Sequence, residues 1–374
     1  MTIVRATSVN PAVLTWARER AGVSFEDLGA RLGCDSERIV AWESAHEAPT
    51  YRQLQELARF LKRPLAIFFF DTPPEESDDG EEFRLSDGGG DGAATLDTRY
   101  AIREVRARQL RISELADGQN LAGDSYLLRR QGVSARSLRD ILGISVSQQM
   151  SWKDSETAFK EWRLAVERVG VVVFKRSYKQ KEISGLSVWD PVVPAISINN
   201  GTTWNRQIFT LFHELAHLLM RKSGTTRADV APLPTGDALE WACNRFAADV
   251  LLPEGAVAIS SYTGVRSLET ASKRFHVSRD VVLRRLLDDG VVSLSQYRSA
   301  MSRMARDLFL REKAATPGGS FYATTAAYLG PSYLRLAFSA LHGRKLDLYE
   351  TADALGVRPS QVSDLEKYVG EVAP

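Results

Sequence analysis

The most constraining feature of this sequence is a pair of histidines four residues apart, His213 and His217, with Glu214 directly after the first. Residues 204–220 carry apolar side chains at helical spacing, which predicts a single helix. Four helical steps rotate by roughly 400°, so both imidazoles leave the same face about one turn apart. A buried helix gains nothing from these polar side chains unless something binds them. The pair therefore predicts a metal site.

A candidate third ligand, Glu240, opens a second predicted helix 23 residues after His217, beyond a loop that contains proline and glycine. Two histidines and a carboxylate would hold Zn²⁺ with its fourth position open for water, as catalytic zinc sites require. Zinc would acidify that water and polarise a carbonyl, while Glu214 takes up the proton and passes it to the leaving amine. The alternatives are two core histidines spaced by chance and a glutamate on a solvated helix face.

The composition narrows the class of protein further. The chain has 374 residues and a formal net charge of +1, so no global charge attracts nucleic acid or a membrane. Its two cysteines, Cys34 and Cys243, form no disulfide framework and suit a reducing compartment. The N-terminus lacks an uninterrupted apolar stretch, and no apolar run is long enough to span a bilayer. We therefore expect several domains and a cytoplasmic protein without a membrane contact.

The pattern along the chain predicts helices first and a sheet later. Helices are expected over 11–21, 24–32, 35–43 and 51–61, and a long charged helical pattern covers 99–130. Residues 71–97 hold ten acidic residues and five glycines, which is typical of a flexible linker. Strands are expected at 171–174, 186–189 and 195–198. The last of these either pairs with an extended peptide substrate or lies inside the sheet.

At the histidine helix the chain resembles the ImmA/IrrE family of metallo-endopeptidases. The family pattern Ile-x-Ile-Asn, then Arg-x-x-Phe-Thr-x-x-His-Glu-x-x-His, is matched over 196–217. The second block, Glu-x-x-Ala-Asn-x-Phe-Ala followed by Leu-Leu-Met-Pro, is matched over 240–253, with Cys243 and Leu252 in place of alanine and methionine. The resemblance spans about 150–290. It implies that His213, His217 and Glu240 bind zinc, that Glu214 is the catalytic acid/base, and that the substrate is a repressor of prophage, mobile-element or stress genes.

The first 70 residues resemble the XRE (Cro/cI-type) helix-turn-helix. The matching segments are 24–33, 38–43 and 49–58, with Ile39 and Trp42 expected in the core. The resemblance implies that the helix over 35–43 enters the major groove, where Ser36, Glu37 and Arg38 are the expected contacts. Nine basic residues against eight acidic ones in 1–70 make a weak electrostatic footprint for a DNA-binding domain. A helical module that docks only protein remains the alternative.

Together these features predict a multidomain chain that begins with an all-α helix-turn-helix domain. An α+β zincin-like metallopeptidase domain and a helical C-terminal region follow. The expected boundaries are 1–70, a linker at 71–97, the peptidase at 98–300 and the C-terminal region at 301–374. We expect a zinc endopeptidase that cleaves a regulatory protein and binds DNA through its first domain, with a homodimer as its candidate assembly. The competing hypothesis is a transcriptional regulator whose zinc domain senses or binds a partner without turnover.

Overall fold

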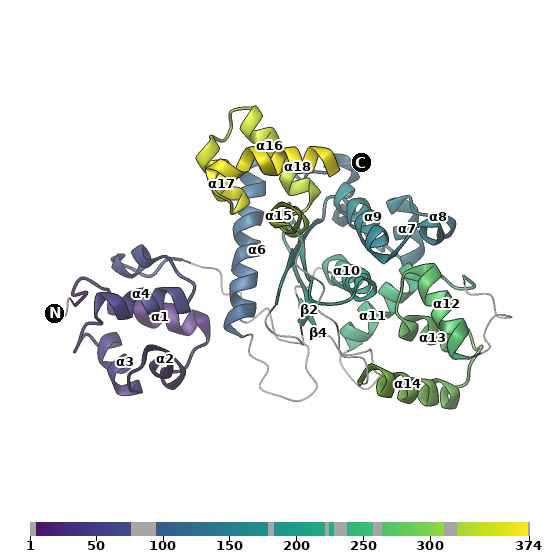
Figure 1. The fold of residues 1–374 in the computed structure, drawn as a ribbon, viewed down its shortest axis with the longest axis horizontal. Helices are drawn as coiled ribbons and strands as arrows, with labels where there is room; N and C mark the ends of the chain where they lie inside the picture. The colour runs from purple at the N-terminus through teal and green to yellow at the C-terminus, as the bar shows by residue number, and fades with distance from the viewer. Residues whose placement is uncertain are drawn as a thin grey trace. The chain divides into compact units, whose positions relative to one another are not determined.

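The structure is a computed structural model that describes residues 5–75, 95–178, 183–220, 224–227, 238–256, 264–309 and 320–372 (Figure 1). These residues divide into two units, one formed by 5–75 and 95–104 and the other by 105–372. The linker expected at 71–97 falls mainly outside the described residues. No described helix combines the length and the apolar character that crossing a membrane needs.

The first unit is helical, and its helices begin and end close to the residues that the sequence predicts. Gly22 and Gly33 end the first two helices with φ angles of 65° and 67°, a region that glycine enters without strain. Ser24 and Asp35 cap the second and third helices with their side-chain oxygens. Ile39 and Trp42 are buried in the core, which confirms their expected place. The helices are α1 (Pro11–Ala21), α2 (Phe25–Leu32), α3 (Ser36–Glu43), α4 (Tyr51–Phe60) and the 3₁₀ helix η1 (Leu65–Phe69).

The second unit is built on a mixed four-stranded sheet in the order β1-β3-β2-β4. The strands are β1 (Val172–Arg176), β2 (Ile183–Val188), β3 (Ala195–Asn199) and β4 (Gly224–Arg227). β3 runs parallel to β1 and antiparallel to β2, with Ala195 opposite both Val172 and Val188. Since β3 is paired on both sides, the hypothesis that it binds an extended substrate is wrong. It is an interior strand.

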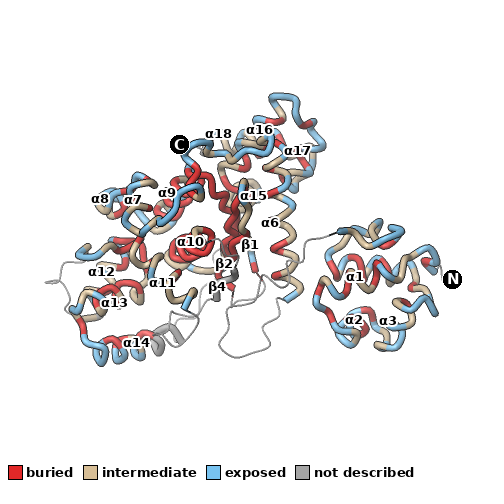
Figure 2. The backbone as a smooth tube through the Cα atoms, turned by 180° about the vertical axis from the view of Figure 1, so that it is seen from behind, coloured by how far each residue is buried: buried red, intermediate tan, exposed pale blue. Residues whose placement is uncertain are grey.

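Helices cover both faces of this sheet. Successive side chains of β1 point to opposite faces, and the two neighbours Phe174 and Lys175 show this alternation. Lys175 lies over the rings of Phe159 on α9 (Ser155–Arg168) and Trp204 on α10 (Trp204–Leu219). Phe174 instead meets Tyr333 of α16 (Pro331–His342) and Arg108 of α6 (Leu96–Leu115). In Figure 2 the strands β1 to β3 and helix α10 are mostly buried.

The helix expected over 99–130 is shorter than the charge pattern indicated. α6 starts at Leu96 and ends at Leu115, and two residues with positive φ, Asp117 and Gly118, follow it. The backbone N–H of Gly118 donates to the carbonyl of Ser113, which closes the helix end. The charged pattern indicates only that the residues are exposed to solvent, and turns are exposed as well as helices. The pattern therefore continues beyond the end of the helix.

The remaining helices of the second unit surround the sheet and complete a mostly helical α+β architecture. Helix α15 packs on β1, so the C-terminal helices belong to the same unit as the sheet. These remaining helices are α7 (Ala135–Leu142), α8 (Val146–Ser151), α11 (Ala238–Leu251), α12 (Val265–Phe275), α13 (Arg279–Asp288), α14 (Leu294–Phe309), α15 (Phe321–Leu329), α17 (Leu348–Leu355) and α18 (Val362–Val372).

Candidate metal centre

Helix α10 carries both histidines of the motif in its buried middle. Its first turn is capped by Thr203, whose hydroxyl accepts a hydrogen bond from the backbone N–H of Arg206 at 3.4 Å. His213, Glu214 and His217 are each no more than 1% exposed. The two imidazole centroids lie 4.8 Å apart, one turn after the other on the same face. The helix thus presents two ring nitrogens to one point, as the four-residue spacing predicts.

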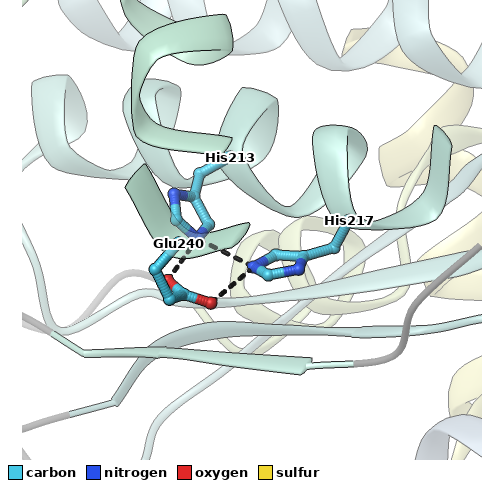
Figure 3. Close-up of side chains that lie close together, drawn as sticks. All are labelled: His213, His217 and Glu240. Atoms are coloured by element: carbon cyan, nitrogen blue, oxygen red, sulfur yellow. Dashed lines mark hydrogen bonds and ion pairs between the residues drawn. The ribbon is translucent and has the colours of Figure 1, made fainter. Parts of the chain in front are cut away.

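Helix α11 brings Glu240 to the same point (Figure 3). One carboxylate oxygen of Glu240 lies 3.2 Å from Nε2 of His213, and the other lies 3.0 Å from Nε2 of His217. The two Nε2 atoms are 3.0 Å apart. Ligand atoms about 2.0–2.1 Å from a tetrahedral zinc ion would be roughly 3.3 Å from one another. The three side chains therefore converge closely enough to hold a single metal ion.

Hydrogen bonds within this cluster stabilise the charged forms of His217 and Glu240. Burial by itself would lower the pKa of His217, but hydrogen bonds with Cys243 and Glu240 outweigh it and raise that pKa to about 11. Burial would likewise raise the pKa of Glu240, yet its hydrogen bonds to His213 and His217 hold that pKa below the ordinary value. A metal ion binds only unprotonated imidazole, so metal binding at this site must release protons.

Two residues of α11, Asn244 and Cys243, interact with the histidines. Nδ1 of His213 donates to the amide oxygen of Asn244 at 2.9 Å, so Nε2 is the ring nitrogen that would bind a metal ion at this site. Cys243 is fully buried and interacts with His217, and burial raises the pKa of its thiol. A protonated, inaccessible thiol is unreactive, which agrees with a packing role for Cys243.

Glu214 faces the sheet because α10 lies unusually close to β2. The close approach depends on Gly185: a Cβ atom at that position would lie 2.5 Å from Cγ2 of Thr210 and 3.5 Å from Cγ of Glu214. The first distance is shorter than any real contact of such atoms. A glycine in β2 therefore lets the helix set the Glu214 side chain against the strand.

Sequence reasoning missed both Asn244 and Gly185 as parts of the site. Asn244 stands one turn after Glu240 inside the matched motif, so its position on the helix was a usable signal. Gly185 carries no such signal, because only the packing of α10 on β2 makes the absence of a side chain necessary.

The residues expected to contact DNA lie in the first turn of α3, in the first unit. Glu37 and Arg38 are exposed, and Ser36 is half-buried. Nε of Arg38 lies 3.5 Å from a carboxylate oxygen of Glu47, whose exposed side chain also pairs with Arg5 at 3.4 Å. Exposed pairs of this kind are weak, so Arg38 can exchange its partner at little cost.

Comparison with known families bears on the segment that holds the metal centre. Residues 166–287 match the model of the IrrE N-terminal-like domain, peptidase family M78. The match includes β1 to β4, α10, α11 and all four residues of the motif, His213, Glu214, His217 and Glu240. It supports a metallopeptidase-type domain in this part of the chain.

Two further comparisons add no structural argument. No curated protein matches the chain. A crystal structure of Bacillus thuringiensis PlcR in complex with the peptide PapR7 and DNA is similar at 10% sequence identity, over 97% of this chain and 98% of that chain. Its TM-score of 0.16 is too low for any inference about fold or partners.

Proposed function

We propose that this chain is a zinc-dependent endopeptidase joined to a helix-turn-helix module that binds DNA. The observation that carries the proposal is the convergence of His213, His217 and Glu240 within 3.0–3.2 Å of one another, inside a segment that matches a peptidase domain. A packed helix with the histidine pair, a sheet beneath it and a third ligand from the following helix support a zincin-like assignment.

The donor set favours zinc. Two imidazole nitrogens and one carboxylate oxygen are common ligands of catalytic zinc, and three protein ligands leave one position open to solvent or substrate. Asn244 supports the same assignment, because ligating histidines regularly donate their second ring N–H to an oxygen acceptor. A bound zinc ion would act as a Lewis acid that polarises the substrate carbonyl and makes water more acidic.

The role of Glu214 follows from its place beside the ligands. It is fully buried, follows His213 directly and turns its side chain toward β2. Its carboxylate takes a proton from the attacking water as the new C–O bond forms. It then delivers that proton to the amine nitrogen as the C–N bond breaks. His213, His217 and Glu240 are assigned as metal ligands and take no part in this proton transfer.

The first unit supports the assignment of a DNA-binding module. Helices α1 to α4 each have an N-cap residue, and α2 and α3 are separated by the short turn at Gly33, as in helix-turn-helix proteins. We assign Ser36, Glu37 and Arg38 to groove contacts and a repressor of stress, prophage or mobile-element genes as substrate. Helix-turn-helix proteins commonly bind paired half-sites as dimers, so we include a homodimer in the proposal.

A cleavage assay tests the enzymatic part of this proposal. Zinc-loaded full-length protein is incubated with candidate repressors encoded near its gene, and products are identified by mass spectrometry. Cleavage should require zinc and should stop in Glu214→Gln, because the amide keeps the shape of the side chain but accepts no proton. Unchanged cleavage by Glu214→Gln would remove Glu214 from the mechanism. A protein that binds zinc but cleaves none of the candidates would favour the regulator that senses or binds a partner without turnover.

A further inference from the structure

Helices α16, α17 and α18 lie together (Figure 1), and α17 and α18 repeat the helix-turn-helix of the first unit. Helices α2 and α17 both have eight residues and start at Phe25 and Leu348, so each residue of the repeat lies 323 positions after its counterpart. The 3₁₀ helix η5 (Pro359–Gln361) leads into α18 and begins at the position equivalent to Ser36, the first residue of α3. We call α16, α17, η5 and α18 the C-terminal module.

The turn between the two helices of the motif has the same backbone in both places. Gly33 and Gly356 follow α2 and α17 with φ angles of 67° and 65°. The next residue, Cys34 or Val357, donates its backbone N–H to the carbonyl five residues earlier at 3.0 Å in each case. The chain therefore leaves α2 and α17 in the same direction.

The caps and the core positions of the two modules also correspond. The side chains of Ser24 and Asp347 each accept a hydrogen bond from the backbone N–H three residues later. Four positions of the motif are buried in both modules. They are Leu28, Leu32, Ile39 and Trp42 in the first unit and Thr351, Leu355, Val362 and Leu365 in the C-terminal module.

A contact between the first and the third helix is repeated as well. Glu43 of α3 pairs with Arg18 of α1 at 2.7 Å. Its counterpart, Glu366 of α18, lies 3.0 Å from Nε2 of His342, the last residue of α16. Helix α16 thus takes the place of α1, and the C-terminal module has all three helices of a helix-turn-helix domain.

The third helix of the C-terminal module leaves one face exposed to solvent. Ser360, Ser363 and Lys367 follow one another three or four residues apart, and all three are exposed. Their counterparts in the first unit, Glu37, Val40 and Ser44, are exposed too. In helix-turn-helix proteins this face of the third helix enters the major groove.

The side chains on this face can contact DNA. Arg358 and Lys367 are exposed and belong to no ion pair among the residues that the structure describes, so both cations can meet phosphate. The hydroxyl groups of Ser360 and Ser363 can bind base edges or phosphate. No acidic residue stands between Arg358 and Ser363, whereas the equivalent segment of the first unit contains Glu37.

The one acidic residue on the face is Asp364. Its carboxylate accepts a hydrogen bond from the hydroxyl of Tyr322 at 3.1 Å, and in the major groove a carboxylate accepts from the amino group of cytosine. Residues 331–372 contain five basic and six acidic side chains, so general attraction to phosphate is weak. Affinity must therefore come from contacts with particular bases.

We propose that the C-terminal module is a second helix-turn-helix domain and that the exposed face of α18 binds duplex DNA in the major groove. The chain then has one DNA-binding module before the metal centre and one after it. Such a module adds a second DNA-binding surface to the proposed function, and it needs neither peptidase activity nor DNA binding by α3.

Selection from a pool of random-sequence duplexes tests the C-terminal module without a known operator. The full-length protein used for selection carries Val40→Glu, which places a negative charge on the exposed face of α3 and suppresses its contribution. We expect this protein to enrich a common sequence.

In the same background Ser363→Glu makes the equivalent change on α18. It should lower the affinity for the enriched duplex about tenfold or more, because a carboxylate then faces the phosphates and a base contact is lost. Ser339→Glu adds the same charge at an exposed position of α16 and should leave the affinity unchanged. Circular dichroism of each variant checks that the helices remain folded.

A second substitution measures the phosphate contact. In the Val40→Glu background, Lys367→Ala should reduce the slope of log affinity against log salt concentration by about 1. Lys160→Ala removes the same charge from an exposed position on α9 and should leave that slope unchanged.

Two results would overturn the assignment of α18. One is that the Val40→Glu protein enriches no sequence, and the other is that Ser363→Glu leaves the affinity for the enriched duplex unchanged. The same selection with Ser363→Glu in place of Val40→Glu measures DNA binding by α3, so the assignments of the two modules are tested separately.

Discussion

The amide oxygen of Asn244 lies 2.9 Å from Nδ1 of His213, one helical turn beyond Glu240 on α11. One helix thus supplies a candidate metal ligand and also the group that orients another ligand. Hydrogen bonds of this kind select the imidazole tautomer whose Nε2 faces the metal. The stability of the metal site therefore depends on how α11 packs against α10.

Removal of this hydrogen bond should weaken metal binding. We expect Asn244→Ala to lower zinc affinity by about 10–100-fold, because His213 then loses its fixed orientation. Asn244→Asp keeps an acceptor oxygen and should retain affinity. Competition with a fluorescent chelator measures both. Asn205→Ala is the matched control, since the side-chain amide of Asn205 donates to the backbone carbonyl of Val277 and not to a histidine. Equal affinity of Asn244→Ala and the unmodified protein would contradict the orienting role.

Loss of one histidine should remove the metal. We expect the purified protein to contain one zinc ion per chain and His217→Ala to contain almost none, because two remaining ligands hold zinc weakly. Elemental analysis after dialysis measures the content. His342→Ala should keep its metal, because His342 is exposed and pairs with Glu366 at 3.0 Å, away from the cluster. Full metal retention in His217→Ala would rule out the site as described.

The contact between β2 and α10 should tolerate no side chain at position 185. Gly185→Ala places a Cβ 2.5 Å from Cγ2 of Thr210, so the helix or the strand must shift. We expect a loss of about 1–3 kcal/mol in the free energy of unfolding. Adding Thr210→Ser removes the clashing methyl group and should restore much of that loss.

Urea denaturation of both variants gives the comparison. Gly370→Ala is the control, since its added Cβ would meet no atom within 4 Å and α18 would gain helix propensity. A single variant as stable as the unmodified protein, or a double variant less stable than the single one, would show that the close approach of α10 is not limited by Gly185.

The buried amine of Lys175 should make stability depend on pH. Burial, and then the positive charge of Arg163, lower the pKa of Lys175 from 10.5 to about 7. Between these values the unfolded chain binds a proton that the folded chain has released, so stability rises with pH from about 7 to 10.5. Below pH 7 Lys175 is protonated in the folded chain as well, so the full free-energy cost of burying its charge is present. Since one pKa unit corresponds to about 1.4 kcal/mol, that cost amounts to a few kcal/mol.

Lys175→Met should remove this dependence. We expect the variant to be more stable than the unmodified protein at pH 7, with a smaller rise between pH 7 and pH 9. Urea denaturation at the two pH values measures both quantities. Because the ammonium group also lies 4.1 Å from the Trp204 ring centroid, a cation–π attraction opposes the burial cost. A variant that is less stable at pH 7 would show that this attraction dominates.

Loss of the Arg38 side chain should weaken DNA binding without affecting the metal. We expect Arg38→Ala to reduce affinity for a duplex selected in vitro by about 5–150-fold, which corresponds to a lost base contact of ~1–3 kcal/mol. Titration at two salt concentrations separates base contacts from phosphate contacts. Arg136→Ala removes the same charge from an exposed position on α7 and should leave affinity unchanged. Equal losses in both variants would indicate only a general charge effect.

Much of the local structure of this protein could be predicted from the sequence. Gly22, Ser24 and Gly33 mark helix ends because capping and left-handed φ angles depend on a few adjacent residues. His213 and His217 share a face because the helical period alone determines their relative direction. Glu240 could be proposed as a third ligand because it is a carboxylate that opens the next predicted helix, whereas its approach to the histidines depends on how α11 packs against α10.

The tertiary structure decided what no local rule determines. Whether β3 lies inside the sheet depends on which strands pair with it. In the fold β1 pairs with one side of β3 and β2 with the other. The need for a glycine at 185 arises only because α10 packs on β2. Likewise, the pocket that Asn244 lines is formed only where residues of α10, α11, α13 and α14 meet. Local propensity depends on neighbours in the chain, whereas these contacts join residues far apart in it, so packing energy selects them.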